Sequence, residues 1–260
     1  MSGDSSDGEV GVGDDPLFRF ESTEKRFESV VHSLLLVFAA FFFAGLLVVL
    51  AQSVLDGAGL SSDSAPVFAE VVLTSVNFLG LALVSLWYLD WRSDWSLIGF
   101  RRPTRRDIGI IVAGSVGLIL VILALDVVLS YFGLEPDENV AVETGREHPE
   151  LFLYYIPIVL LLNAPAEELL FRGVVQGLFR RAYGVVPGIV AASLLFGLIH
   201  YVALAGDGSA AAYVAIAFIS GILLGTLYEY TGNLLVPTVV HAAWNILVYL
   251  NLYAETMGLF

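Results

Sequence analysis

Hydrophobic residues form uninterrupted runs of about 20 positions along most of the chain, without the period-two alternation of a half-buried strand. A helix of ~20 residues rises ~1.5 Å per residue and crosses a ~30 Å hydrocarbon layer. The runs cover residues 30–54, 67–87, 108–132, 151–179, 186–204, 210–228 and 234–253. We therefore predict an all-α, polytopic membrane bundle of about seven transmembrane helices, or six or eight if the fourth run is re-entrant or broken.

Composition supports a membrane protein and excludes a soluble globular enzyme. Of the 260 residues, 57% are hydrophobic and only 15% are charged, whereas soluble domains carry about 25% charged residues. The first run follows an acidic leader and lacks the basic start of a secretory signal, so we expect a retained span. The chain has no cysteine, which excludes disulfides, thiolate ligands and a cysteine nucleophile.

The charged residues indicate how the chain crosses the membrane. Residues 1–29 hold eight of the 26 acidic residues, and we predict an acidic cytoplasmic tail, disordered at least to about residue 20. Eleven of the twelve Lys and Arg residues precede the first run, separate the second from the third, or close the fourth; only Arg146 falls in an opposite-side loop. This positive-inside pattern predicts a multi-pass protein of the cell membrane with a cytoplasmic N-terminus.

Another six acidic residues lie in the loop at 133–150, against Arg146 alone. This acidic outer loop, together with the use of eleven Arg and only one Lys in the whole chain, suggests adaptation to high salt. The net charge is −14, and we expect a lipid bilayer but no nucleic acid as a partner.

Ionisable residues inside the apolar runs need a reason, because a charge at the bilayer centre costs at least ~2.5–3.5 kcal/mol. Glu70, Asp126 and Glu229 are single acids toward span ends, and we expect interfacial or structural roles for them. His32 opens the first run and His148 lies in a loop, so both are expected to be solvated.

The fourth run contains two adjacent acids, Glu167 and Glu168, between apolar neighbours. Glu168 and Arg172 are four residues apart and can form an ion pair along one helix face. Glu167 points elsewhere, since successive helical residues differ by ~100°, and it needs a partner of its own. Pro165 lacks an N–H, so the helix is expected to be kinked or opened just before the acids.

Two later runs contribute polar residues at comparable depth: His200 in the fifth, and His241 with Asn245 one turn later in the seventh. Together with Glu167 they could form one cluster. A Glu base, two imidazoles and an amide donor can activate water for peptide hydrolysis. Two His and one carboxylate also match a hydrolytic zinc site, so zinc or another divalent metal held by these three residues is an alternative.

Three motifs in order carry a family resemblance: Glu-Glu-x-x-x-Arg at Glu167–Arg172, Phe-x-x-x-His at Phe196–His200, and His-x-x-x-Asn at His241–Asn245. In this respect the chain resembles the CPBP family of intramembrane proteases, which includes the type II CAAX prenyl endopeptidases and bacteriocin-immunity proteins. The resemblance covers about residues 150–252. It implies a CPBP-like catalytic core at 150–260, after transmembrane helices without motifs at 30–149.

Carried over by position, the resemblance implies Glu167 as the base that activates water, supported by the Glu168–Arg172 pair. It implies His200 and His241 as metal ligands or oxyanion stabilisers, and Asn245 as an oxyanion donor. Phe196 is expected to serve packing.

The implied activity is a membrane-embedded endopeptidase acting on a membrane-associated peptide, such as a prenylated CAAX-type C-terminus. Two alternatives remain open at this point. One is a non-proteolytic binding or immunity protein that keeps the cluster for stability, and the other is an ion or proton transporter that uses the same buried groups.

Overall fold

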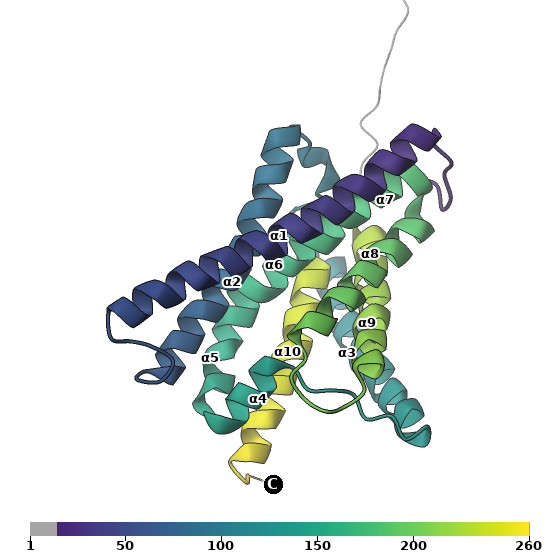
Figure 1. Ribbon diagram of the computed structural model, residues 1–260. Coiled ribbons are helices and arrows are strands. Elements are labelled where there is room, and N and C mark those ends of the chain that lie inside the picture. The colour runs from purple at the N-terminus through teal and green to yellow at the C-terminus, as the bar shows by residue number, and fades with distance from the viewer. Residues whose placement is uncertain (1–14, 260) are drawn as a thin grey trace, which may run out of the picture.

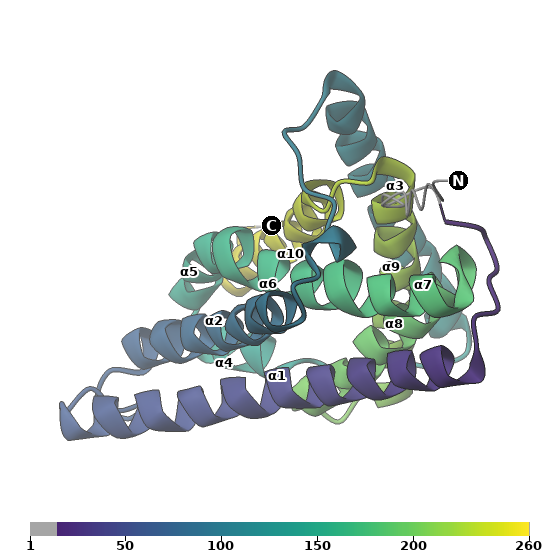
Figure 2. The same cartoon turned by 90° about the horizontal axis from the view of Figure 1, so that it is seen from above.

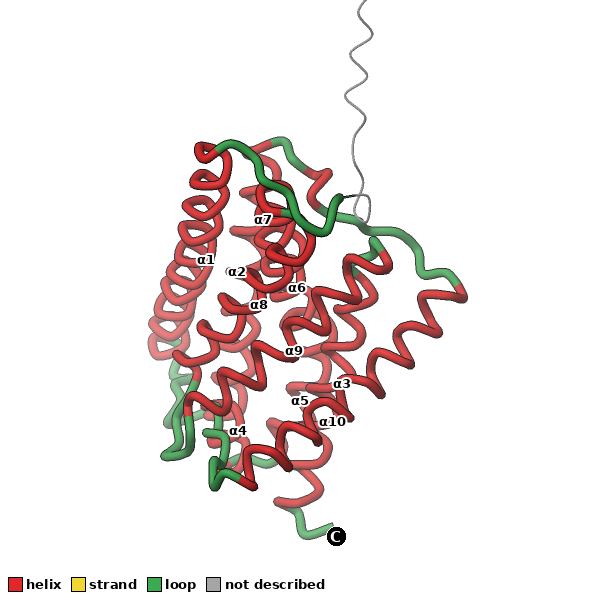
Figure 3. Tube along the Cα trace, turned by 90° about the vertical axis from the view of Figure 1, so that its right-hand side faces the viewer, coloured by secondary structure: helices red, strands yellow, loops and turns green. Residues whose placement is uncertain are grey.

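The predicted helices are present in the computed structural model, which describes residues 15–259 (Figure 1). The α-helices are α1 Thr23–Gly57, α2 Pro66–Arg92, α3 Arg105–Tyr131, α4 Val140–Glu147, α5 Glu150–Ile158, α6 Ala164–Glu168, α7 Gln176–Tyr183, α8 Val185–Ile199, α9 Ala210–Thr231 and α10 Leu235–Thr256. Within residues 15–259 there is no β-strand, and the loops gather at the two ends of the helices (Figure 3).

Six helices of the described residues are long and apolar enough to cross a membrane: α1, α2, α3, α8, α9 and α10. Each coincides with a predicted run, and many of their large apolar side chains, such as Phe38 and Phe42 of α1, face outward. An apolar exterior of this kind suits contact with lipid. The chain is thus a polytopic all-α membrane protein, as predicted.

The fourth predicted run is helical throughout, but two π-helical segments interrupt its α-helix. Between α5 and α6 lies the π-helical segment Val159–Asn163, and between α6 and α7 lies a second one, Leu169–Val175. The first ends just before Pro165, which has no N–H for a regular helical hydrogen bond. The opening expected before the acids is confirmed as a wide helical turn, a form that is frequent at functional sites.

The segment α6–α7 packs against the outer helices α1, α2, α8 and α10. Seen from above, α1 runs along one side of the bundle (Figure 2), where it packs on α2 and α7, while α3 packs on α9 and α10. The contact of α1 with α2 is close at Gly80, where an added Cβ would lie 2.7 Å from the Cα of Ala44. Small residues allow such approach where helices gain no hydrophobic attraction from lipid.

The helix ends that carry most of the basic residues meet at one end of the bundle, opposite to the C-terminus (Figure 1). Arg92 at the end of α2 pairs with Glu28 of α1 at 3.4 Å, and Arg181 of α7 pairs with Asp94. Burial disfavours the charged form of Asp94, but its hydrogen bond to Arg181 and the charge of that residue outweigh this and lower its pKa. That this end is cytoplasmic remains a prediction.

Of the tail predicted to be disordered, residues 1–14 lie outside the described residues, while residues 15–19 make contacts with α7 and α8. The N–H of Arg19 donates to the carbonyl of Tyr183 at 2.8 Å, and the carbonyls of Pro16 and Leu17 accept from the turn that opens α8. The Asp15 carboxylate pairs at 3.0 Å with Arg180, which is buried. A buried cation needs a partner, and composition alone did not reveal that the tail supplies one.

Candidate active site

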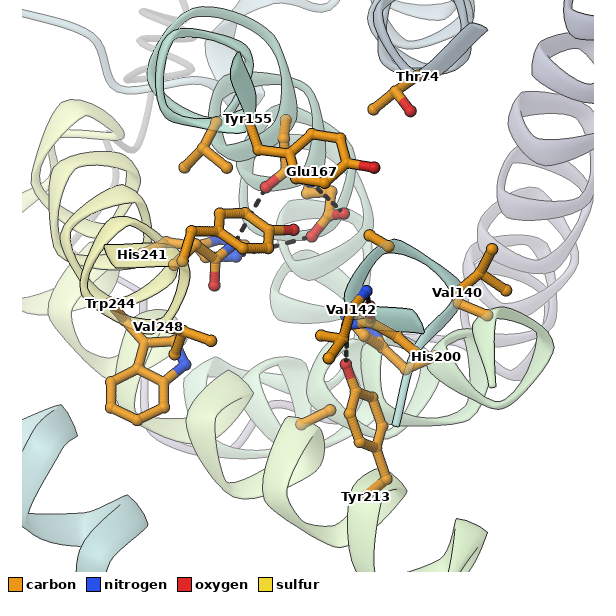
Figure 4. A pocket seen from close by; sticks show the side chains of 18 of the residues that line it. Thr74, Val140, Val142, Tyr155, Glu167, His200, Tyr213, His241, Trp244 and Val248 are labelled. Carbon is orange, nitrogen blue, oxygen red and sulfur yellow. Dashed lines mark hydrogen bonds and ion pairs between the residues drawn. The ribbon is translucent and has the colours of Figure 1, made fainter. Parts of the chain in front are cut away.

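The polar residues expected to form a cluster line one cavity of about 950 Å³ inside the bundle. Glu167 comes from α6, His200 from the turn after α8, and His241 and Asn245 from α10. Figure 4 shows Glu167, His200 and His241 pointing into the same space from different helices. Residues up to 78 positions apart in the sequence therefore converge, as their similar depths predicted.

Behind the cavity wall, Glu168 and Arg172 form the expected ion pair, with 3.0 Å between the Arg172 nitrogen and Glu168 Oε1. Both side chains are essentially buried, at 0% and 1% exposure. The same Glu168 oxygen lies 2.8 Å from His241 Nδ1. Because an ionised carboxylate only accepts hydrogen bonds, His241 Nδ1 carries the proton and donates it, which leaves Nε2 as the nitrogen turned to Glu167.

Glu167 has the separate partner that its position required. The Asn163 amide donates to Glu167 Oε1 at 2.8 Å, and the Asn245 amide donates to Asn163 Oδ1 at 3.1 Å. The other oxygen, Oε2, lies 3.8 Å from His241 Nε2 and accepts no hydrogen bond from residues 15–259. One Glu167 oxygen is thus held in place, while the other is buried without a hydrogen bond from residues 15–259.

His200 lies at the end of α8, where the helix tightens into the turn His200–Ala203. Its Nδ1 donates to the carbonyl of Phe196 at 2.6 Å, since a carbonyl oxygen can only accept. This fixes the tautomer and leaves the Nε2 lone pair free. The ring contacts those of Phe196 and Tyr213, at centroid distances of 4.5 and 6.2 Å.

Phe196 packs at the centre of the site, as expected. Its ring contacts those of Phe171, His200 and His241, and the Arg172 guanidinium lies 4.2 Å from its centroid. A cation over a desolvated aromatic face is attracted by the ring quadrupole. Phe196 therefore links the buried ion pair to both histidines.

The arrangement does not fit the three-ligand metal site considered from the sequence. Glu167 Oε2 and His241 Nε2 lie 3.8 Å apart, but among residues 15–259 no group of three His, Asp or Glu side chains could hold a metal ion. A hydrolytic zinc site needs three protein ligands around one point. Glu167, His200 and His241 as metal ligands stay a prediction that this geometry does not support.

Several residues of the site were not singled out from the sequence. Asn163 lies one turn before Glu167 on the same helix face, and that spacing was the available signal. Glu70, expected to be structural, also lines the cavity, as do Tyr155 and Tyr249. Their places depend on contacts between distant helices, for which the sequence holds no periodic signal.

Comparison with known proteins bears directly on this part of the chain. Residues 149–247, which include the entire polar cluster, match the family described as "Type II CAAX prenyl endopeptidase Rce1-like". The C-terminal part of the chain is thus similar to the Rce1-like family. The resemblance seen in the three motifs is thereby confirmed, and the family is one of membrane peptidases.

A relative in Bacillus subtilis (strain 168), "Uncharacterized protein YpbD", is 34% identical over 140 residues. The match covers 52% of this chain and 65% of the relative, which is just under two thirds of the relative's length. No solved structure matches.

Proposed function

We propose that the protein is an intramembrane endopeptidase of the Rce1-like family that hydrolyses a membrane-associated peptide with water activated by Glu167. The observation that carries the proposal is the hydrogen-bonded arrangement of Glu167, Asn163 and Asn245 beside His241, in one cavity within the bundle. A general base must lie within hydrogen-bond reach of the water it deprotonates. Glu167 lines the cavity, and its Oε2 is buried without a hydrogen-bond donor among residues 15–259.

In the proposed reaction, a water molecule between Glu167 and the scissile carbonyl gives its proton to the Glu167 carboxylate as its oxygen attacks the carbonyl carbon. The negative charge that develops on the carbonyl oxygen needs preorganised donors. The Asn245 amide has one N–H left after its bond to Asn163, and His241 can donate from Nε2 when protonated. Glu167 then passes its proton to the leaving nitrogen as the C–N bond breaks, which gives a free amine and a carboxylic acid that ionises by losing its remaining proton to water.

The residues around this centre hold it in place. Glu168 orients His241 through Nδ1, and Arg172 balances the Glu168 charge at 3.0 Å. His200 offers its free Nε2 to the cavity opposite His241, where it can bind the attacking water or the substrate backbone. Such supporting contacts hold reacting groups near productive geometry.

The family and the cavity wall together favour a prenylated peptide as substrate. Apolar side chains line much of the cavity, among them Leu118 and Ile122 of α3 and Leu224 of α9. A prenyl chain gains free energy from contact with such surfaces. A carboxyl-terminal CAAX-type segment would then bring its scissile bond to the polar end of the cavity.

A reconstitution experiment tests this proposal. Wild type, Glu167→Gln and Asp126→Asn are placed in liposomes with a farnesylated CAAX-type peptide, and the products are identified by mass spectrometry. Asp126 is an acid of α3 that does not line the cavity, so its variant is the matched control. We expect cleavage by wild type and Asp126→Asn, and a loss of roughly 100-fold or more in Glu167→Gln.

Equal cleavage by Glu167→Gln and wild type would overturn the proposed chemistry. Peptide binding without cleavage by any of the three proteins would instead favour a binding or immunity protein. Ion flux into the same liposomes that is lost in Glu167→Gln, again without cleavage, would favour a transporter.

A further inference from the structure

Glu70 lies on the α2 wall of the same cavity, at the end of the bundle away from the basic loops, and the proposed chemistry does not use it. It is the fifth residue of α2, within a segment apolar enough to cross a membrane. A carboxylate there has an energetic cost that simple packing does not offset. The contacts of Glu70 indicate its role.

Two hydroxyl groups hold one Glu70 oxygen. Thr74 Oγ1 donates to Oε1 at 2.8 Å from the next turn of α2, and the Tyr155 hydroxyl donates to the same oxygen at 3.0 Å from α5. In Figure 4 the hydroxyls of Thr74 and Tyr155 turn toward one another on the side of the cavity where Glu167 lies. These two hydroxyls are the hydrogen-bond donors to the Glu70 carboxyl group among residues 15–259. They fix its orientation and leave Oε2 without a hydrogen bond from residues 15–259.

Within residues 15–259, no positively charged side chain of the cavity wall pairs with Glu70. Of the described residues that line the cavity, none is a lysine or an arginine. The other acidic lining residues are accounted for: Glu138 pairs with Arg146 at 2.9 Å, Asp137 accepts from the backbone N–H of Glu138, and Glu167 is the proposed base. Glu70 is the remaining carboxylate of the cavity wall, and it faces the space where the substrate is proposed to bind.

We propose that Glu70 is a specificity-determining residue that receives a lysine or arginine side chain of the peptide substrate, near the bond to be cleaved. This inference rests on the proposed peptidase function. Apolar residues flank Glu70 on the cavity wall, including Leu73 and Phe78 of α2 and Ile158 of α5. A lysine or arginine has an apolar stem and a charged head, so its stem would lie along this wall and its head would meet Oε2.

An exclusively structural role would require only a hydrogen-bond acceptor at position 70, without a charge. If the carboxylate served only to join α2 to α5 through Tyr155, a neutral glutamine would suffice, because its amide oxygen also accepts from Thr74 and Tyr155. Glu70→Gln therefore removes the charge while keeping the acceptor, and it separates recognition from helix packing.

The test compares substrate preference between wild type, Glu70→Gln and Asp126→Asn in liposomes. The substrates are farnesylated peptides that differ at one position, which carries Lys, Gln or Glu and is scanned along the four residues on each side of the scissile bond. Wild type and Asp126→Asn are expected to cleave the best-placed Lys peptide at least tenfold more efficiently, by kcat/KM, than its Glu counterpart. In Glu70→Gln this ratio falls to within about twofold of one, while cleavage of the Gln peptide stays within about threefold of wild type.

Peptide binding, measured by fluorescence anisotropy on the same proteins, keeps this inference separate from the peptidase proposal. A Lys preference in binding that disappears in Glu70→Gln supports the inference even if no peptide is cleaved. Equal Lys-to-Glu ratios in wild type and Glu70→Gln, in binding and in cleavage, overturn it and leave Glu70 as a structural acceptor. Loss of all binding in Glu70→Gln also overturns it, because a specificity residue should spare the Gln peptide.

Discussion

The buried ion pair of Glu168 and Arg172 allows a quantitative prediction about stability. Replacing Arg172 by Met keeps an unbranched side chain over Phe196 but leaves the Glu168 carboxylate without its cation, in a place where both residues are at most 1% exposed. Removing one partner of a buried pair costs about 3–5 kcal/mol, because the other charge stays uncompensated. Arg172→Met and Glu168→Gln should each lose this much of the free energy of unfolding.

The double variant Glu168→Gln/Arg172→Met should be more stable than either single variant. It removes both charges of the pair, and the amide oxygen of the introduced glutamine can still accept from His241 Nδ1. Replacing a buried pair by neutral residues is often neutral or stabilising, so we expect a loss of under about 2 kcal/mol. Reversible unfolding in mixed micelles, followed by far-UV circular dichroism, gives the four free energies of the cycle. If the double variant loses the sum of the two single losses, the pair is not coupled and the account of this contact is wrong.

The contacts of the site and the bundle give three further predictions. Asn163→Ala removes a 2.8 Å hydrogen bond to Glu167. A hydrogen bond to a charged group contributes about 1.5–3 kcal/mol, so we expect kcat to fall roughly ten- to a hundredfold. An unchanged kcat in steady-state kinetics would refute the positioning role of Asn163. EDTA is expected to leave peptide cleavage unchanged, since residues 15–259 offer no three-ligand group; loss of activity that zinc restores would show the opposite. Gly80→Leu places its Cβ 2.7 Å from the Cα of Ala44, whereas Gly117→Leu meets open space. Thermal unfolding in detergent should show that Gly80→Leu lowers the free energy of unfolding by about 1–3 kcal/mol, while Gly117→Leu leaves it unchanged.

Much of the fold could be predicted from the sequence, because apolar runs of sufficient length form helices in lipid. Six runs became long helices, and the fourth became a helix with two wide turns. The helical period also predicted the Glu168–Arg172 pair, and Pro165 predicted the opening before the acids. These are local relations, set by spacing along one helix.

Contacts between segments far apart in the chain could not be predicted from the sequence. The pairing of Glu70 with Tyr155 joins residues 85 positions apart, and the salt bridge of Asp15 with Arg180 anchors a segment whose composition resembles a disordered tail. Periodicity says which face a residue occupies but not which helix lies against it. The cluster around Glu167 could be anticipated because its residues lie at comparable depths in their spans and because three motifs in order resemble a known family.

The central claim, that Glu167 is the base that activates water, is tested most directly by chemical rescue. Glu167→Ala removes the carboxylate and leaves space in a cavity of about 950 Å³ for a small anion. Cleavage of the farnesylated peptide is followed while the formate concentration is raised, with Glu168→Ala as the comparison because that site is buried. The account predicts a saturable recovery of cleavage in Glu167→Ala and none in Glu168→Ala. Wild-type rates in Glu167→Ala without formate would contradict it, and so would equal recovery in both variants.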